Sequence, residues 1–226
     1  NKQVNLNKQK SIINKLNFSL TNDQIKSLDE INKDLRSENK MFRLLQGDVG
    51  SGKTIVSLMG AINTINSGFQ VAFMAPTEIL ARQHYKLANK IFPSSINIEL
   101  ISGKSEHKTK KEILKKLENN KIDIIFGTHA IFQKKVIFKK LGLIIIDEQH
   151  KFGVNQRKKL SDKGGPDCDV LLMTATPIPR TLTMTIYGDM DISIIREKPK
   201  NRKPIKTYSK LESKIDDILK FISKEI

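Results

Sequence analysis

Short, strongly apolar runs alternate along the middle of the chain with longer stretches whose apolar residues recur every three or four positions. The short runs have the length and β-branched content of strands buried on both faces, and the longer stretches have the period of amphipathic helices. This alternation predicts an α/β fold, a doubly wound parallel sheet with helices on both faces. The predicted strands are Phe42–Leu45, Val71–Ala75, Ile96–Ile101, Asp123–Phe126, Leu143–Ile146, Val170–Met173 and Ile192–Ile195. The predicted helices are Asn22–Ser37, Thr54–Asn66, Glu78–Ile91, Lys108–Asn119, Gln156–Ser161 and Pro179–Ile186.

The two ends of the chain have a different pattern. Residues 1–17 are mostly polar, and we expect them to form a connecting segment or short helix that arrives from a missing upstream domain. Residues 18–196 hold every predicted strand and are expected to form one domain. Residues 197–226 begin with a basic stretch that contains prolines, which is typical of an exposed hinge. They end in a helix pattern whose apolar stripe is expected to open a truncated second domain; the stripe is Ile215, Ile218, Leu219 and Ile222.

Composition narrows the class of protein without deciding it. The chain has 40 Lys and Arg against 24 Asp and Glu, a net charge of +16, which suits a polyanionic partner. Because only seven of these basic residues are arginine, a general drift toward lysine explains the charge equally well. The single cysteine, Cys168, excludes an internal disulfide, and the histidines His84, His107 and His129 are too scattered to form a metal site. The N-terminus is polar and no long apolar run exists, so we expect a soluble, cytoplasmic protein without membrane contact.

A glycine-rich stretch between a predicted strand and a predicted helix carries the clearest chemistry. It fits the phosphate-loop pattern GxxxxGK[ST], in which glycines let backbone N–H groups converge on a phosphate at a helix N-terminus. Its lysine is expected to reach the terminal phosphates of ATP and its threonine hydroxyl to bind Mg²⁺. An incidental glycine-rich turn is the alternative. The nucleotide-binding residues predicted here are Gly47, Asp48, Val49, Gly50, Ser51, Gly52, Lys53 and Thr54.

Two acids follow the apolar run Leu143–Ile146 directly. Open α/β sheets bind their ligands at the carboxyl ends of strands, which is where Asp147 and Glu148 fall. Mg²⁺ prefers hard oxygen ligands, so Asp147 is predicted to bind the metal together with Thr54. Glu148 is the candidate that orients or deprotonates the attacking water. Lys53, Asp147 and Glu148 are thus the predicted catalytic residues, although a pair of acids in this place is also an ordinary strand cap.

Three further loops follow predicted strands and should open on the same edge of the sheet. They are Ala75–Thr77, Gly127–His129 and Thr174–Pro177. Hydroxyls and backbone amides on such an edge can hold a sugar-phosphate backbone without reading its bases. A Thr-Ala-Thr loop can sense the bound nucleotide and pass its state on. Each loop alone also fits a turn or a helix cap.

In this order the motifs resemble those of the superfamily 2 helicases, and within them the RecG-type ATP-dependent DNA helicases. The resemblance covers about residues 16–205. It implies a P-loop NTPase (RecA-like) fold, ATP and Mg²⁺ as ligands, and branched or duplex DNA as partner. The matching stretches are Phe18–Gln24, Arg43–Thr54, Met74–His84, Gly127–Ala130, Asp147–Arg157 and Met173–Leu182.

The resemblance also assigns roles to individual residues. It implies nucleotide contacts for Phe18 and Thr21, and it gives Gln24 the adenine edge. The DNA-binding residues that it implies are Pro76, Thr77, Arg82, Gly103, Gly127, Thr128 and His129. The residues that it implies in coupling hydrolysis to movement are Gln149, His150, Thr174, Ala175, Thr176 and Arg180. Lys151 stands where the family usually has arginine, so a bidentate contact assigned to that position is in question.

Motifs IV to VI of such helicases, with the arginine finger of the second motor lobe, do not occur in the chain, nor does the N-terminal wedge domain. We therefore expect one lobe of a monomeric motor that binds nucleotide, hydrolyses it very slowly and unwinds nothing alone, since an arginine finger contributes roughly 10³ to 10⁵ in rate. Two alternatives stay open. One is the equivalent lobe of a transcription-repair coupling translocase, and the other is a non-catalytic nucleotide-switch or DNA-binding module.

Overall fold

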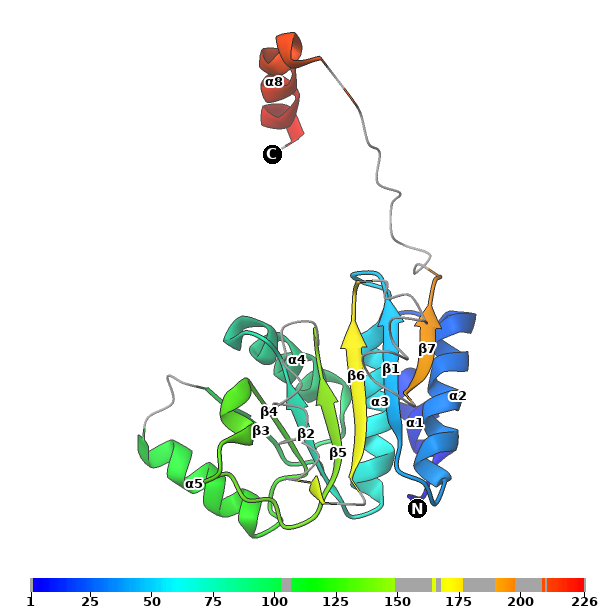
Figure 1. The fold of residues 1–226 in the computed structure, drawn as a ribbon, viewed down its shortest axis with the longest axis vertical. Coiled ribbons are helices and arrows are strands. Elements are labelled where there is room, and N and C mark those ends of the chain that lie inside the picture. The colour runs from blue at the N-terminus through cyan, green and yellow to red at the C-terminus, as the bar shows by residue number, and fades with distance from the viewer. Residues whose placement is uncertain are drawn as a thin grey trace.

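A seven-stranded sheet forms the centre of the molecule in the computed structural model, which describes residues 2–102, 107–148, 164–165, 168–176, 190–197, 209 and 211–225. Within these ranges all strand pairs are parallel, and the order is β3-β4-β2-β5-β6-β1-β7 (Figure 1). The strands are β1 (Phe42–Gly47), β2 (Gln70–Met74), β3 (Ile98–Ile101), β4 (Ile124–Gly127), β5 (Leu141–Ile146), β6 (Asp169–Thr174) and β7 (Asp191–Ile195). The predicted doubly wound parallel sheet and its seven strands are confirmed.

Helices connect the strands and cover the sheet. They are α1 (Leu6–Ile13), α2 (Asn22–Arg36), α3 (Lys53–Asn66), α4 (Glu78–Ile91), α5 (His107–Glu118) and α8 (Ile215–Glu225), with 3₁₀ turns η1 (His129–Phe132) and η3 (Glu212–Lys214). The helices predicted at Asn22–Ser37, Thr54–Asn66, Glu78–Ile91 and Lys108–Asn119 are confirmed within one or two residues. The helices predicted at Gln156–Ser161 and Pro179–Ile186 lie outside the described residues.

Side chains of successive strand residues enter two separate cores, one on each face of the sheet. Leu45 and Phe73 belong to the core beneath α1, α2, α3 and α4. Their neighbours Leu44 and Ala72 belong to the core shared with α5 and η1. Because both faces are covered, the central strands are continuous apolar runs, and this is why they were recognisable in the sequence.

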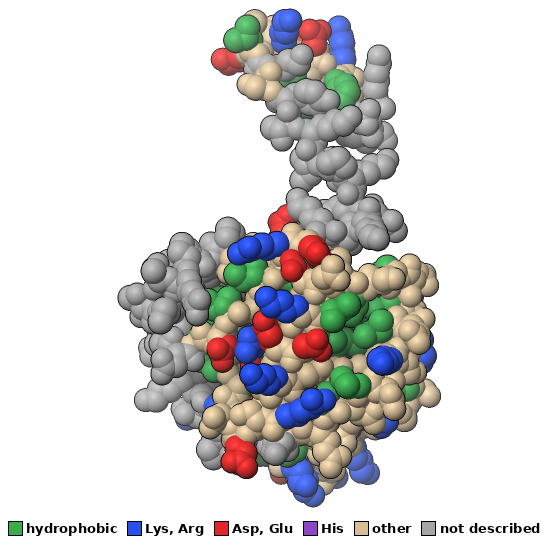
Figure 2. Space-filling view, turned by 90° about the vertical axis from the view of Figure 1, so that its right-hand side faces the viewer, with side chains coloured by type: hydrophobic (Ala, Val, Ile, Leu, Met, Phe, Trp, Pro, Cys, Tyr) green, Lys and Arg blue, Asp and Glu red, His purple; other side chains and the backbone are tan. Residues whose placement is uncertain are grey.

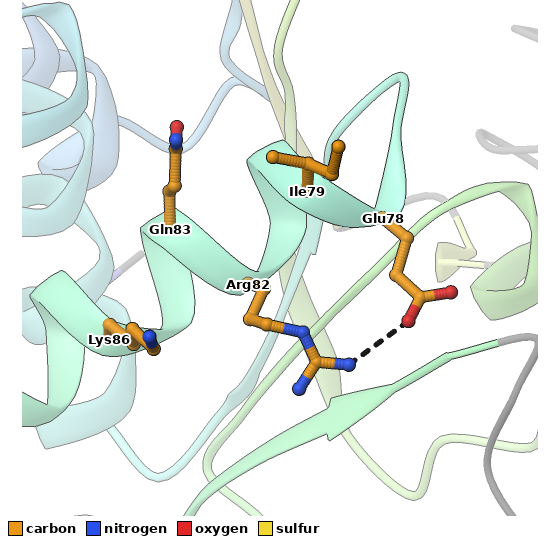
Figure 3. A pocket seen from close by; sticks show the side chains of 5 residues that line it. All are labelled: Glu78, Ile79, Arg82, Gln83 and Lys86. Carbon is orange, nitrogen blue, oxygen red and sulfur yellow. Dashed lines mark hydrogen bonds and ion pairs between the residues drawn. The ribbon is translucent and has the colours of Figure 1, made fainter.

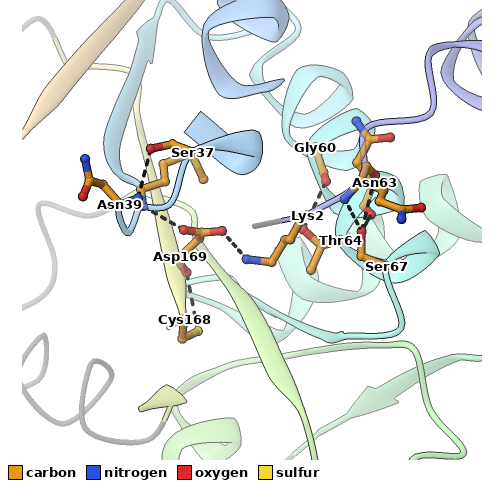
Figure 4. A network of polar contacts seen from close by, with 11 residues as sticks. Lys2, Ser37, Asn39, Gly60, Asn63, Thr64, Ser67, Cys168 and Asp169 are labelled. Carbon is orange, nitrogen blue, oxygen red and sulfur yellow. Dashed lines mark hydrogen bonds and ion pairs between the residues drawn. The ribbon is translucent and has the colours of Figure 1, made fainter. Parts of the chain in front are cut away.

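The N-terminal segment, residues 2–13, packs against α2 and α3 through a buried polar cluster (Figure 4). The Lys2 ammonium pairs with the Asp169 carboxylate, and both side chains are about 95% buried. The Gln9 amide donates to Asn32 Oδ1 at 3.2 Å and to the Met59 carbonyl at 2.9 Å. We call Gln9, Asn32 and Asn63 the amide network, because Asn63 Nδ2 also donates to Asn32 Oδ1, at 2.9 Å.

At the other end of the chain, α8 presents its apolar stripe to solvent. Of this stripe, Ile215, Leu219 and Ile222 are 55%, 59% and 45% exposed, whereas Ile218 is half-buried; Phe221 beside them is exposed as well. The only neighbouring element with substantial contact in the part of the chain that the structure describes is η3. No described helix is long and apolar enough to cross a membrane.

Candidate active site

Parallel strands all end at one edge of the sheet, and this edge gathers the predicted site. The phosphate loop follows β1, the two acids follow β5, and Thr174–Thr176 ends β6. β6 lies between β1 and β5, so the loop and the acids are two strands apart (Figure 1). The loops after β2 and β4 open at the same edge, farther along the sheet. The sheet therefore brings the predicted nucleotide-binding and DNA-binding residues to one side.

The phosphate loop has the backbone conformation that its glycines allow. Gly50 and Gly52 have φ angles of +76° and +91°, which other residues adopt only with strain. A Cβ on Gly52 would also lie 2.3 Å from the Gln24 amide nitrogen. Lys53 begins α3, and its Nζ donates to the carbonyls of Gly47 at 2.7 Å and Asp48 at 3.1 Å. The loop and its lysine form a compact cradle at the N-terminus of α3, where backbone N–H groups attract anions.

Both predicted acids affect the pKa of this lysine. Burial lowers the pKa of Lys53, while the charges of Glu148, Asp147 and Asp48, in decreasing order, act to raise it. Glu148 has a φ of +52°, an unusual conformation for a residue with a side chain. Such a strained backbone persists only where the surrounding structure holds it in place, and it occurs most often at functional sites. The three predicted catalytic residues, Lys53, Asp147 and Glu148, therefore interact electrostatically.

The donor groups fit a nucleotide phosphate with Mg²⁺. The Ser51 hydroxyl is buried, with the residue 1% exposed, and has no hydrogen-bond partner among the described residues. An orphaned buried donor in a phosphate loop indicates a group that a ligand satisfies. The described residues contain no cluster of three or more His, Cys, Asp or Glu side chains that would form a metal centre by itself. Thr54 and Asp147 suit Mg²⁺, which is commonly held by one or two protein oxygens together with substrate phosphates and water.

Asp147 has a close partner that the sequence analysis missed. His84 Nε2 lies 2.7 Å from Asp147 Oδ2, and the two residues are 8% and 7% exposed. The scatter of the histidines along the chain gives no indication of this pair. The signal was its spacing, because His84 falls on the same buried stripe of α4 as Ala81, Ala88 and Ile91.

The predicted adenine-contacting segment lies directly against the phosphate loop. Thr21 and Gln24 form a capping box at the start of α2, with Gln24 Oε1 accepting from the Thr21 N–H at 3.0 Å. The Gln24 Nε2 donates to the Ser51 carbonyl at 2.7 Å. Both polar atoms of this side chain therefore have protein partners in this structure. Phe18 is 45% exposed and lines an open hollow with Leu16, Leu20 and Ile25.

The predicted DNA-binding residues of α4 lie at its exposed end. Thr77 caps the helix by accepting from the Leu80 N–H at 3.3 Å, and Pro76 precedes it. Arg82 is half exposed and pairs with Glu78 at 3.0 Å (Figure 3). These two side chains border a shallow hollow of about 560 Å³, whose other lining residues are Ile79, Gln83 and Lys86.

Gly127 ends β4, Thr128 follows it, and His129 begins η1. A Cβ on Gly127 would lie 2.7 Å from the Ile101 carbonyl oxygen, so the close approach of β3 requires glycine here. At the end of β6, the hydroxyls of Thr174 and Thr176 lie 2.8 Å apart, with Ala175 between them. The remaining predicted residues lie outside the described part of the chain; they are Gly103, Gln149, His150 and Arg180.

Comparisons with known proteins agree with this geometry. The family model described as DEAD/DEAH box helicase matches residues 21–185. The ATP-dependent DNA helicase RecG of Borreliella burgdorferi is 49% identical over 216 residues, which cover 95% of this chain and 31% of that protein. RecG of Bacillus subtilis is 50% identical, with the same shares covered. The chain thus spans about a third of the length of these curated relatives.

Solved structures give the same result. A structure of RecG bound to a three-way DNA junction superposes with a TM-score of 0.86 at 39% identity, covering 98% of this chain and 30% of that one. The DUF1998 helicase MrfA bound to DNA has a TM-score of 0.67 at 15% identity and covers 96% of this chain and 34% of its own. The MrfA likeness concerns the fold alone.

Proposed function

Because the chain belongs to the DEAD/DEAH box helicase family, we propose that it is the N-terminal, ATP-binding motor lobe of a RecG-like DNA helicase. One observation supports the chemistry most directly: the phosphate loop after β1 and the acids after β5 share one sheet edge. The charges of Glu148 and Asp147 also act to raise the pKa of Lys53, which burial lowers. The similarity to RecG proteins, which covers 95% of this chain and 31% of theirs, supports the class of motor.

In this proposal each residue at the edge has a role in phosphoryl transfer to water. Lys53 binds the terminal phosphates as a positive charge, and the loop N–H groups orient them. Thr54 and Asp147 would hold Mg²⁺, which would neutralise charge on the phosphates. Glu148 accepts a proton from the attacking water or orients it. Thr174 and Thr176, between these two groups, are placed to respond to the nucleotide.

DNA is proposed to lie along the loops after β2 and β4, held through its sugar-phosphate backbone by Thr77, Thr128 and neighbouring groups. Support comes from the exposed Thr77, from the partly exposed Thr128, and from the similar RecG structure, which is bound to a three-way DNA junction. The face over α2 is a poor alternative, because acidic and basic side chains are interspersed there (Figure 2). Branched DNA, remodelled in recombination and repair, is the proposed substrate.

The remaining two thirds of a RecG-like protein would supply what this lobe lacks. We propose that residues 1–17 connect to an upstream wedge domain, residues 18–196 form the motor lobe, and residues 197–226 lead into the second lobe. The exposed stripe of α8 supports the last assignment, since it is a surface suited to burial. The assembled protein is proposed to be a cytoplasmic monomer.

A substitution of the proposed base tests the function. In the full-length protein, Glu148→Gln should lower the DNA-stimulated turnover number for ATP by about 100-fold or more, because a general base contributes roughly 10² to 10⁴. Nucleotide affinity should change little, since Lys53 and the loop remain. Steady-state ATPase assays with branched DNA measure the first quantity, and fluorescent nucleotide titration measures the second.

Glu112→Gln is the matched control, because Glu112 is an exposed glutamate on α5, away from the phosphate loop. It should behave like the wild type. Unchanged turnover in Glu148→Gln would show that another group orients the water. A wild-type protein that binds ATP without hydrolysing it, with or without DNA, would support the nucleotide-switch alternative.

A further inference from the structure

The hydrogen bond between His84 and Asp147 joins two elements that are remote in sequence. Asp147 directly follows β5, and its backbone N–H donates to the Met74 carbonyl of β2 at 2.8 Å. His84 lies in the second turn of α4, the helix that follows β2. Nε2 and Oδ2 are 2.7 Å apart, and the two side chains are about 90% buried. The bond is short and shielded from water, the conditions in which a hydrogen bond orients a group firmly.

The His84 ring is itself held in place by packing. It lies tilted against Phe73 of β2, with ring centroids 4.9 Å apart. Phe73 stacks on Phe126 of β4 at 5.0 Å, and Tyr85 of α4 meets Phe126 edge-on at 6.2 Å. We call these three residues the aromatic support. Because the support fixes the ring, His84 can hold the carboxylate in one orientation.

The chemistry of the two groups gives the bond a direction. A carboxylate only accepts hydrogen bonds, so the Nε2–H of His84 donates to Oδ2 of Asp147. A metal-ligating carboxylate works best when a neighbouring donor fixes its orientation, and loss of such a partner commonly costs 10- to 100-fold in metal affinity or activity. Lys53, which also interacts with Asp147 electrostatically, belongs to the nucleotide site itself, whereas His84 lies on α4.

We propose that His84 is a positioning residue for Asp147, holding its carboxylate in the orientation that binds Mg²⁺ beside the nucleotide. The proposal rests on the proposed function of the phosphate loop, and it assigns to α4 a direct contact with the metal site. His84 contributes through Asp147 and needs no contact with the nucleotide.

Equilibrium binding of a fluorescent, non-hydrolysable ATP analogue to the full-length protein tests this, with titrations in Mg²⁺ and in EDTA. His84→Phe keeps a ring against Phe73 and removes the donor. It should weaken binding in Mg²⁺ by about 10-fold and leave binding in EDTA unchanged. His84→Gln places an amide nitrogen at a similar reach and should restore most of the Mg²⁺-dependent affinity. A purely structural role would lower both titrations together and would not be rescued by glutamine.

Two further variants keep the result decisive. His84→Met also lacks a donor but fills the space flexibly, and it replaces His84→Phe if circular dichroism shows that the phenylalanine variant is not folded. Tyr85→Leu removes an edge contact with Phe126 but leaves Phe73 against the His84 ring, so it should change the Mg²⁺ effect by less than about twofold.

The outcomes separate the two proposals. An unchanged Mg²⁺ effect in His84→Phe or His84→Met overturns the positioning role and leaves the nucleotide site standing. Equal losses in the phenylalanine and glutamine variants also overturn it. A wild-type protein that does not bind the analogue in Mg²⁺ overturns the proposed function, and the positioning role with it.

Discussion

Two regions of this molecule that bury polar side chains differ in whether those side chains have hydrogen-bond partners. In the amide network beneath α1, the side chains of Gln9, Asn32 and Asn63 donate to and accept from one another, and Lys2 pairs with Asp169 nearby. At the phosphate loop, the Ser51 hydroxyl is buried without a described partner, and Gly52 has a left-handed backbone. The two regions lie at opposite ends of α3.

This difference distinguishes a region that stabilises the fold from a region that binds a ligand. A satisfied polar network contributes to a unique fold, whereas groups that the fold leaves strained or unpartnered are held ready for something else. The amide nitrogen of Asn66, the last residue of α3, is also buried without a described partner, so the criterion applies to the amide network itself. This network stabilises the lobe, and the phosphate loop is the ligand site. Substitutions in the first region should change stability, and substitutions in the second should leave it nearly unchanged.

The largest expected effect comes from breaking the buried ion pair. Asp169→Ala should lower the free energy of unfolding by about 3–5 kcal/mol, because it leaves the Lys2 ammonium buried without its counter-charge. It also removes the acceptor of the Met41 N–H, which donates to Asp169 Oδ1 at 2.7 Å. Urea unfolding of the chain, followed by circular dichroism, measures the change.

The double variant Lys2→Met with Asp169→Leu is the control for this prediction, since replacing both charges with apolar groups is often neutral. It should recover much of the loss. A cost below about 1 kcal/mol for Asp169→Ala would mean that the pair is not buried in solution, and the N-terminal segment would then not be part of the structural core.

A smaller effect is expected from Asn32→Ala, which removes the acceptor shared by Gln9 and Asn63. Leaving such groups buried and unpaired should cost about 1–3 kcal/mol. Ser51→Ala is the matched change at the other end of α3, where the deleted hydroxyl has no described protein partner. It should leave the midpoint of urea unfolding unchanged or raise it. Equal losses in the two variants would erase the distinction between the regions.

The smallest effect concerns Asp23, an exposed carboxylate near the nucleotide edge. It accepts from the backbone N–H groups of Glu197 at 3.0 Å and Arg196 at 2.8 Å, and these bonds lower its pKa from the ordinary 3.8. A lowered folded-state pKa adds stability above pH 3.8, and this contribution disappears as the pH falls through the folded value. The urea midpoints of wild type and Asp23→Ala should therefore converge as the pH falls below 3.8 and through the lowered pKa of Asp23. A gap that persists there would exclude the charge of Asp23 as its cause.

The sequence predicted the sheet well because buried parallel strands are continuous apolar runs. Strand ends were less accurate. The strand predicted from Ile96 begins at Ile98, because the Ile96 N–H donates to the Pro93 carbonyl in a turn. β5 begins at Leu141, two residues before the predicted start. The prediction missed these two residues because Leu141 followed by Gly142 is not a strong apolar pattern.

Some residues of the candidate site could be predicted from the sequence and others could not. The phosphate loop, Asp147 and Glu148 follow from local patterns, because spacing along the chain decides their chemistry. His84 could not be assigned, since its partner is 63 positions away and only the packing of α4 on β2 brings them together. The Lys2–Asp169 pair spans 167 positions, and nothing local to either residue indicates it. Cys168 is buried, and burial raises the pKa of its thiol to about 12, which leaves it unreactive.

α3 runs from the phosphate loop to the anchored N-terminal segment without a break. Its 14 residues form a rod roughly 21 Å long, at about 1.5 Å per residue. Asn63 accepts from the Asn5 N–H at 3.1 Å at the far end of this rod. One continuous helix therefore joins the nucleotide edge of the lobe to the segment by which the chain enters it.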